Sequence, residues 1–212
     1  MPMVIHPRIG RNVRRLATVT ALACFGSAGV AQAACPPQLT TPAFARFGDI
    51  AQYSLAPGGS FEPGQAAWTL NGNSVVSGNE TLFLNNPLDT SSLSINPNTS
   101  VVSPEFCVDA TNPFLRLVAK KAAVKGRIKV EVLYTDETGE AKAKDLGAVT
   151  QGGSNANGDY TDWAPSPVLK LSTALPLPKF ASGTMNVRLR LSADSEPGAW
   201  QVDDVFIDPY RS

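Results

Sequence analysis

The sequence predicts an all-β protein folded as a two-sheet antiparallel β-sandwich, with a jelly roll favoured over an immunoglobulin-type arrangement. Runs of four to nine residues alternate apolar and polar side chains, and clusters of Gly, Asn, Pro and Ser separate these runs. No stretch shows the three- and four-residue apolar spacing of an amphipathic helix. The 17 prolines and 17 glycines suit a fold with many turns.

The first 34 residues read as a secretory signal peptide that is removed from the mature protein. A leader with four arginines and no acidic residue precedes the apolar run 16–30, and Ala31-Gln32-Ala33 forms an A-x-A cleavage site. The apolar run is shorter than the roughly 20 residues that span a bilayer, which disfavours an uncleaved anchor. A lipoprotein attached through Cys35 is a second alternative, disfavoured because Gln32 stands where lipid attachment usually has Leu. We therefore expect a secreted, extracellular protein with no membrane span.

Residues 35–212 are expected to form a single domain, since 178 residues suffice for one well-packed core. Four of the 18 basic residues lie in the leader, so this domain carries 14 basic and 18 acidic groups. Without a basic stripe to follow a phosphate backbone, nucleic acid is not an expected partner. The only histidine, His6, lies in the leader, which excludes Ser-His-Asp and Cys-His catalysis and histidine-bound zinc in the mature chain.

Cysteine usage agrees with export. Cys35 and Cys107 remain after the leader is removed, and two cysteines in an exported chain most often form a disulfide. Two free thiols are the alternative.

The clearest strands are expected at 126–136 and 185–192. In the first, Ile128, Val130, Val132 and Tyr134 share one face, and in the second Val187, Leu189 and Leu191 alternate with arginines. Further strands are expected, in chain order, at 51–55, 66–72, 73–78, 91–95, 113–121, 143–150, 166–172 and 200–207. A single helical turn has room before the strand at 51–55.

The longest polar interruption is 151–167, which embeds Tyr160 and Trp163 among Gly, Asn and Asp. Long loops within compact domains are often functional, and exposed rings can stack on sugars, so Tyr160 and Trp163 are the candidate ligand-binding residues. The alternative is a surface loop whose Trp163 packs back onto the sandwich. Tyr134 is expected in the core, and Trp68 and Trp200 are expected either in the core or covering the end of the sandwich.

The last expected strand carries two adjacent carboxylates, Asp203 and Asp204. Successive residues of a strand point to opposite faces, so both cannot face one layer unless a bulge intervenes. If the first and last strands pair, Glu62 could meet one of them. Carboxylates and loop carbonyls would suit Ca²⁺, which makes Glu62, Asp203 and Asp204 candidate ligands of a structural calcium ion. Hydrogen bonds to backbone N–H groups, or pairing with Arg or Lys, are the alternatives.

Two motifs carry a resemblance. GGSFEPGQAAWTL, near the start of the domain, and GAWQVDDVFID, at its end, resemble the bracketing motifs of carbohydrate-binding modules with the galactose-binding-like jelly-roll fold. Many such modules hold a structural Ca²⁺, which implies Glu62 and Asp203 or Asp204 as its ligands. Most of the chain is also similar to a family of secreted actinobacterial proteins of unknown function, through LAPGGSFE, SPxxCV and WQVDDVFIDPY.

These observations favour a secreted, non-catalytic binding domain, with a polysaccharide or cell-wall glycan as its partner. The alternative is an extracellular structural or adhesion protein with a protein or cell-wall partner. A glycoside hydrolase using two carboxylates is less favoured, because nothing in the spacing of Glu62, Glu80 and Glu105 places two of them in one cleft.

Overall fold

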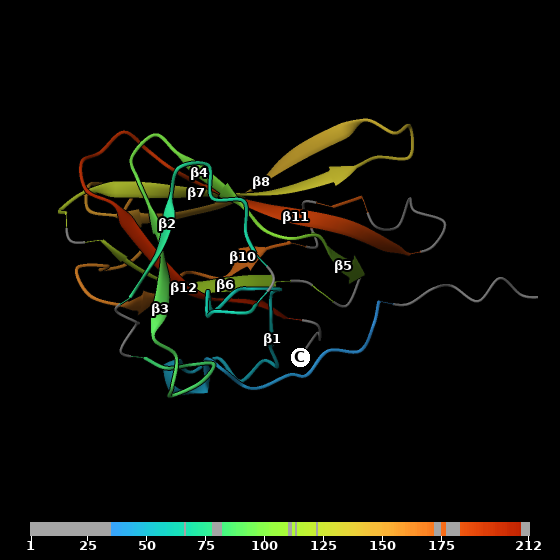
Figure 1. Cartoon of the computed structure of the whole chain (residues 1–212), viewed down its shortest axis with the longest axis horizontal. Helices are drawn as coiled ribbons and strands as arrows, with labels where there is room; N and C mark the ends of the chain where they lie inside the picture. Colours follow the sequence, from blue (N-terminus) through green and yellow to red (C-terminus); the bar gives the residue numbers. More distant parts are fainter. Residues whose placement is uncertain are drawn as a thin grey trace, which may run out of the picture. The chain divides into compact units, whose positions relative to one another are not determined.

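The computed structural model describes residues 35–65, 67–77, 82–109, 112, 114–121, 123–171, 175–176 and 183–208. The predicted leader, 1–34, lies outside these residues. Almost all regular structure in the described part is β-strand, arranged in two antiparallel sheets (Figure 1). One 3₁₀ turn, η1 (Ala45–Phe47), precedes the first strand, where the sequence left room for it. The two-sheet antiparallel sandwich predicted from the sequence is confirmed.

The first sheet has seven strands and contains both the first and the last strand of the chain. Its main order is β10 (Leu169–Lys170), β6 (Phe114–Lys121), β12 (Trp200–Asp208), β3 (Ser91–Ile95) and β2 (Ser74–Ser77). In addition, β1 (Ser54–Leu55) pairs with β12, and β9 (Ala164–Pro165) pairs with β6. The expected pairing of the first and last strands is therefore present.

The second sheet has five strands, in the order β4 (Ser100–Val102), β11 (Thr184–Ala193), β7 (Gly126–Thr135) and β8 (Ala141–Gln151), with β5 (Phe106–Asp109) also on β11. The strands β4, β5 and β9 were not predicted, while the segment expected at 66–72 makes one isolated bridge, Thr69 to Val102. The strands β7 and β8 form a long hairpin, whose tip is at the upper right of Figure 1.

The main hydrophobic core fills the space between the sheets. The alternating residues of β7 and β11 point inward as predicted, with Ile128, Val130, Val132, Leu189 and Leu191 fully buried. Tyr134 joins this core, as predicted, and Trp68 and Trp200 also lie in it.

A second hydrophobic cluster covers the outward face of the seven-stranded sheet. It consists of Phe44, Tyr53, Val118, Trp163 and Phe206. Three of these rings, Phe44, Tyr53 and Phe206, meet edge to face with centroids 5.0–6.4 Å apart. The segment that precedes β1 is thus an integral layer of the domain.

Polar contacts and a disulfide hold that layer in place. The Arg116 guanidinium donates to Asp49 Oδ2 at 2.7 Å, and the Tyr53 hydroxyl donates to the same oxygen at 2.8 Å. Cys35 is bonded to Cys107 of β5, which confirms the predicted disulfide and ties the start of the layer to the opposite sheet. Within the described residues, no helix is long and apolar enough to cross a membrane.

Candidate functional site

A β-bulge in β12 allows both adjacent carboxylates to be buried. The register of β12 against β6 shifts between Asp203 and Phe206, and Asp204 has a left-handed backbone with φ of 47°. Asp203 is 0% exposed and Asp204 is 1% exposed. The sequence analysis expected the two side chains to point to opposite faces unless a bulge intervened, and the structure has that bulge.

These carboxylates accept hydrogen bonds from the backbone. Asp204 Oδ2 accepts from the N–H groups of Leu84 and Asn85, at 3.2 and 3.1 Å. Asp203 Oδ1 accepts from the N–H of Asp204 at 2.8 Å. The two hydrogen bonds to Asp204 hold the loop before β3 on the bulge of β12.

Glu62 holds the other end of the same loop. Its Oε1 accepts from the N–H groups of Thr90 and Ser91, at 2.6 and 2.7 Å, and its Oε2 accepts from the Thr90 hydroxyl at 3.2 Å. Glu62 and Asp204 therefore anchor the two ends of the segment 84–91. We refer to this segment and its two carboxylates as the end clasp.

The end clasp offers hard oxygen donors of the type that Ca²⁺ prefers. In the described part of the chain, however, no three or more His, Cys, Asp or Glu side chains are grouped closely enough to hold a metal. Backbone carbonyls would have to complete the coordination, and the clasp carboxylates already accept N–H groups, which stabilise their charge without a cation. The calcium ion stays a prediction.

The two aromatic candidates of the long loop are buried. Tyr160 is 0% exposed and packs edge-on against Trp200, with ring centroids 5.8 Å apart. Trp163 is 8% exposed and belongs to the second hydrophobic cluster. The expectation of an exposed stacking platform at Tyr160 and Trp163 is corrected, because the energy gained by burying large rings holds both against the sandwich.

The uncovered face of the sandwich is the outward face of the five-stranded sheet. There, Arg127, Lys129, Glu131, Leu133 and Thr135 alternate with the buried residues of β7. The strand register places these side chains beside the outward residues of the neighbouring strands, which are Asn186, Arg188, Arg190 and Ser192 of β11 and Ala143, Asp145, Ala148 and Thr150 of β8. We refer to these three rows as the polar face.

A four-residue ion network occupies the middle of the polar face, in which Lys129 Nζ also lies 3.8 Å from Asp145 Oδ2 of β8. Glu131 Oε1 accepts from Lys129 Nζ at 2.7 Å, and its Oε2 accepts from Arg190 Nε and Nη2, each at 2.8 Å. The Glu131 side chain is only 10% exposed. Burial alone would raise the pKa of Glu131, but the hydrogen bonds from Lys129 and Arg190 outweigh it and lower the pKa. The network therefore stays charged and fixes the orientation of Lys129 and Arg190.

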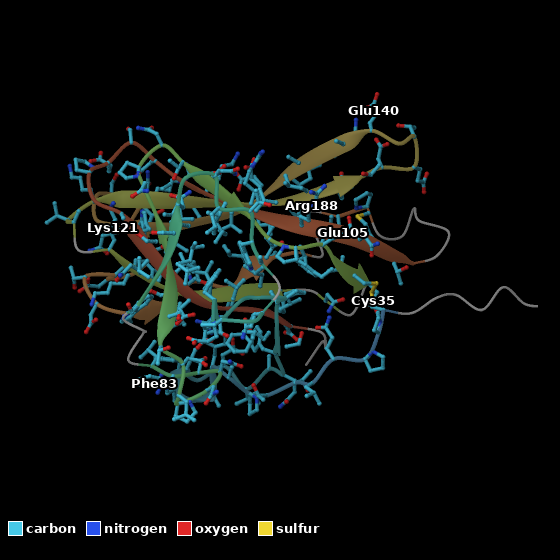
Figure 2. All side chains as sticks on the ribbon, viewed as in Figure 1. Cys35, Phe83, Glu105, Lys121, Glu140 and Arg188 are labelled. Carbon is cyan, nitrogen blue, oxygen red and sulfur yellow. A yellow bond between two sulfur atoms is a disulfide. The ribbon has the colours of Figure 1, made fainter. Side chains whose placement is uncertain are left out.

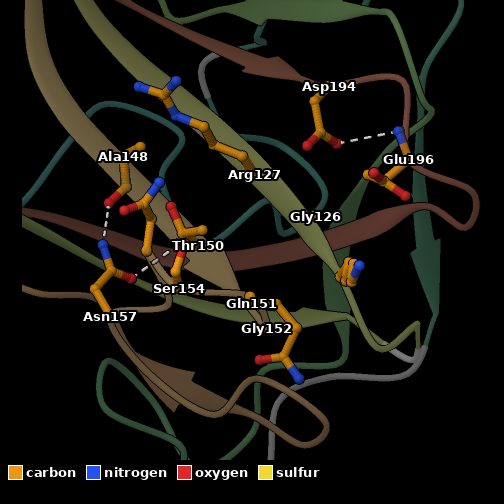
Figure 3. Close-up of a pocket in the computed structure, with 13 residues that line it drawn as sticks. Gly126, Arg127, Ala148, Thr150, Gln151, Gly152, Ser154, Asn157, Asp194 and Glu196 are labelled. Carbon is orange, nitrogen blue, oxygen red and sulfur yellow. Dashed lines mark hydrogen bonds between the residues drawn. The ribbon is translucent and has the colours of Figure 1, made fainter.

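A polar cavity of about 540 Å³ lies at one end of this face (Figure 3). Its lining comes from the start of β7, the end of β8, the loop that follows β8 and the turn after β11. The side chains of this lining are Lys125, Arg127, Ala148, Thr150, Gln151, Ser154, Asn155, Asn157, Asp194 and Glu196. The loop picked out by the sequence analysis thus reaches the cavity through its polar residues.

Asn157 shapes this cavity by holding the loop onto the edge of β8. Its Nδ2 donates to the carbonyl of Ala148 at 2.6 Å, and its Oδ1 accepts from the N–H of Thr150 at 2.9 Å (Figure 3). The backbone N–H of Asn157 donates to the Thr150 carbonyl at 3.1 Å. Asn157 is thus a positioning residue, since its amide is used within the protein.

The buried Lys121 positions the other side of the cavity. Its Nζ donates to the carbonyls of Pro197 and Gly198, at 3.1 and 2.6 Å, which fixes the turn after β11. Burial lowers the pKa of Lys121, while the charges of Asp194 and Glu196 oppose that shift. Nothing in the composition of the sequence marked this lysine as buried.

A second cavity, of about 300 Å³, lies at the other end of the polar face. Glu105, Leu133, Ala143, Asn186 and Arg188 are among its lining residues. Figure 2 labels Glu105 and Arg188, which lie at this end, and Glu140, which lies near the tip of the β7–β8 hairpin. Along β7, the ion network of Glu131 lies between the two cavities.

The carboxylates considered for catalysis do not share a cleft. Glu62 lines an apolar cavity of about 320 Å³ with Phe61 and Trp68, whereas Glu105 lines the cavity at the end of the polar face. Glu80 lies outside the described residues. The arrangement of Glu62 and Glu105 therefore gives no support to a two-carboxylate mechanism.

Solved structures with similar folds are carbohydrate-binding modules, the class that the end motifs resemble. One is the Clostridium thermocellum endo-1,4-β-D-xylanase 10B, whose CBM22-1 and GH10 modules were solved with xylohexaose. It is 17% identical over 66% of this chain, with a TM-score of 0.46, and the match spans only 26% of its own length. The CBM22-1 xylan-binding domain of Paenibacillus barcinonensis Xyn10C is 15% identical over 75% of this chain and 99% of its own, with a TM-score of 0.46. The TmCBM61 complex with β-1,4-galactotriose is 14% identical over 73% of this chain and 92% of its own, with a TM-score of 0.38.

No protein-family model matches the sequence, and no curated protein matches it either. Since all three TM-scores are below 0.5, what the site can do is judged from its own residues.

Proposed function

We propose that the protein is a secreted, non-catalytic glycan-binding protein that binds an extended polysaccharide along the polar face. The observation that carries this proposal is the position of the two cavities at opposite ends of one exposed sheet face. Arg127 at one end and Thr135 at the other are eight residues apart on β7, or about 26 Å at 3.3 Å per residue. A face of that length, lined by hydroxyl, amide and charged groups, suits several consecutive sugars of a chain.

The other outward face does not offer such a surface. The second hydrophobic cluster and the segment before β1 cover the middle of the seven-stranded sheet, while exposed residues remain on its edge strands β2 and β10. Polar groups that converge on a concave surface are what a ligand rich in hydroxyl groups requires. This comparison of the two faces supports the five-stranded sheet as the binding surface.

The test is the migration of the purified protein through native gels that contain neutral or charged polysaccharides. We expect one class of polysaccharide to retard the protein. The double variant Ala143→Gln/Ala148→Gln adds bulk at two outward positions of β8 and should lose that retardation. The matched control Ala45→Gln adds the same side chain to an exposed position on the layer that covers the other sheet.

If the double variant and Ala45→Gln are retarded as strongly as the unchanged protein, the polar face is not the binding surface. If a correctly folded protein is retarded by no polysaccharide, the glycan-binding proposal fails. An adhesion role with a protein partner then becomes the better explanation. That role is favoured by the exposed apolar side chains of Phe47, Ile50, Phe83 and Leu88.

Export and a structural calcium ion at the end clasp belong to the same proposal. Both rest on the sequence: the leader 1–34 for export, and the end motifs for calcium. Export is tested by the N-terminal sequence of protein collected from the culture medium, which should begin close to Cys35. A product that keeps the leader and stays with the cells would contradict export.

A further inference from the structure

The outward positions of the two central strands of the polar face are predominantly cationic. β7 and β11 contribute Arg127, Lys129, Arg188 and Arg190 there, against the single carboxylate of Glu131. The domain as a whole is acidic, with 14 basic and 18 acidic residues after position 34. Cations therefore outnumber carboxylates on these two strands, while Asp145 and Glu105 lie at the flanks and Asp194 and Glu196 line the cavity beside Arg127.

Two of these cations are free to bind a ligand. Lys129 and Arg190 are bound to Glu131, as described above. Arg127 and Arg188 are exposed, and their guanidinium groups make no hydrogen bond or ion pair with any other described residue. Arg188 pairs across the strands with Leu133, so the backbone positions of the two free arginines are six residues, or about 20 Å, apart along the direction of β7.

The large rings that usually stack on neutral sugars are not available on this face. Every Trp and Tyr in the described part of the chain is at most 8% exposed, a set that comprises Tyr53, Trp68, Tyr134, Tyr160, Trp163 and Trp200. Binding energy on the polar face must come from hydrogen bonds and charge. Guanidinium groups bind carboxylate and similar oxyanions through two parallel hydrogen bonds, which makes an anionic ligand the best match.

From these three observations we infer that the ligand of the polar face is an anionic polysaccharide, with carboxylate or sulfate groups repeated along its chain. Arg127 and Arg188 bind two of those groups, one near each cavity. The oriented Lys129–Glu131–Arg190 network, whose Lys129 also pairs with Asp145, lies between them. This inference rests on the proposed function, because it names the class of glycan that the same face would bind.

The test compares two forms of one polymer. Polygalacturonate and its fully methyl-esterified form share a backbone and differ in charge, and dextran sulfate represents the sulfated alternative. In low-salt native gels, we expect polygalacturonate or dextran sulfate, but not the methyl ester, to retard the protein. Arg188→Gln should weaken the affinity about tenfold, the effect of losing one charge-assisted contact. The matched control Lys170→Gln removes one exposed cation from the seven-stranded sheet and should leave the affinity unchanged.

The outcomes separate this inference from the proposed function. Equal retardation by polygalacturonate and by its methyl ester would overturn the inference while leaving glycan binding intact. Equal weakening by Arg188→Gln and Lys170→Gln would also overturn it, because binding would then follow total charge. Stronger binding to polygalacturonate than to dextran sulfate of equal charge density would assign the carboxylate as the recognised group, and the reverse order would assign the sulfate. Retardation by no polymer, charged or neutral, would defeat the proposed function itself.

Discussion

Replacing Asp204 with alanine should destabilise the protein more than most single substitutions. The change removes the Oδ2 that accepts hydrogen bonds from the N–H groups of Leu84 and Asn85, at 3.2 and 3.1 Å. It also places an alanine at a φ of 47°, a left-handed conformation that Asp adopts more readily than Ala does. Both effects act at a position that is 1% exposed.

The expected loss can be built from these two effects. Each hydrogen bond to a charged acceptor contributes about 1.5 kcal/mol, so the two together contribute about 3 kcal/mol. The left-handed backbone adds about 1 kcal/mol for alanine. The expected loss in the free energy of unfolding is therefore about 4 kcal/mol, a large part of the 5–15 kcal/mol typical of a whole domain.

Two further variants divide this loss into its parts. Asp204→Gly tolerates the backbone conformation but lacks the acceptor, and should lose about 3 kcal/mol. Asp204→Asn keeps a residue that adopts the left-handed backbone conformation and keeps one carbonyl oxygen as an acceptor. It should lose about 1 kcal/mol of unfolding free energy. Urea unfolding at pH 7 measures all three. Neutral surface substitutions usually change the free energy of unfolding by less than about 0.5 kcal/mol. If Asp204→Ala changes it by no more than that, the stabilising role of the end clasp is refuted.

Four other predictions concern different parts of the domain. Cys107→Ser opens a loop spanning 72 residues and should lower the unfolding free energy by about 4 kcal/mol, with reduction of the unchanged protein giving the same loss. Burial raises the pKa of Asp49, but bonds from Tyr53 and Arg116 outweigh it and lower the pKa. The stability from Asp49 is thus present above its unfolded pKa of about 4 and is lost as pH falls through the lowered value. Asp49→Asn should lose about 2 kcal/mol at pH 7 and show a shallower acid transition in unfolding titrations, whereas an unchanged acid transition would contradict this. If calcium binds the folded state, saturation at 100 times its dissociation constant adds about 2.7 kcal/mol, so a chelator should lower the melting temperature, and an identical melt would exclude the ion. A Cβ at Gly126 would lie 2.3 Å from Cε of Lys121, so Gly126→Ala should cost about 1–3 kcal/mol by thermal melting, and a neutral result would show that Lys121 moves freely.

The strands that were predicted well from the sequence are those with one buried face and one solvent-exposed face. In β7 and β11, alternation of apolar and charged residues determines both the strand and the direction of its side chains, and the structure has both as expected. The short strands β4, β5 and β9 have two to four residues, too few for a period of two to stand out. They form because longer neighbours supply the pairing partners.

The candidate site was less predictable, because its parts come together only through tertiary contacts. The sequence pointed to Glu62, Asp203 and Asp204 as calcium ligands, but the partners of Glu62 and Asp204 in the structure include backbone groups of the segment 84–91, which side-chain patterns do not reveal. The loop 151–167 was singled out for its rings, but these are buried, and its polar residues line part of the cavity instead. Alternation already placed the arginines outward, but it does not reveal that Glu131 binds two of the four cations and leaves Arg127 and Arg188 free.

The contacts of Asn157 have a consequence for the kind of partner that this end of the sheet can accept. An edge strand with unpaired N–H and C=O groups is a template for any passing extended chain. At 148–150 those groups are occupied by one side chain and its own backbone, so a peptide cannot extend the sheet there without displacing them. The choice of ligand at this end must therefore depend on side chains. Single substitutions can change those side chains without altering the backbone that holds them.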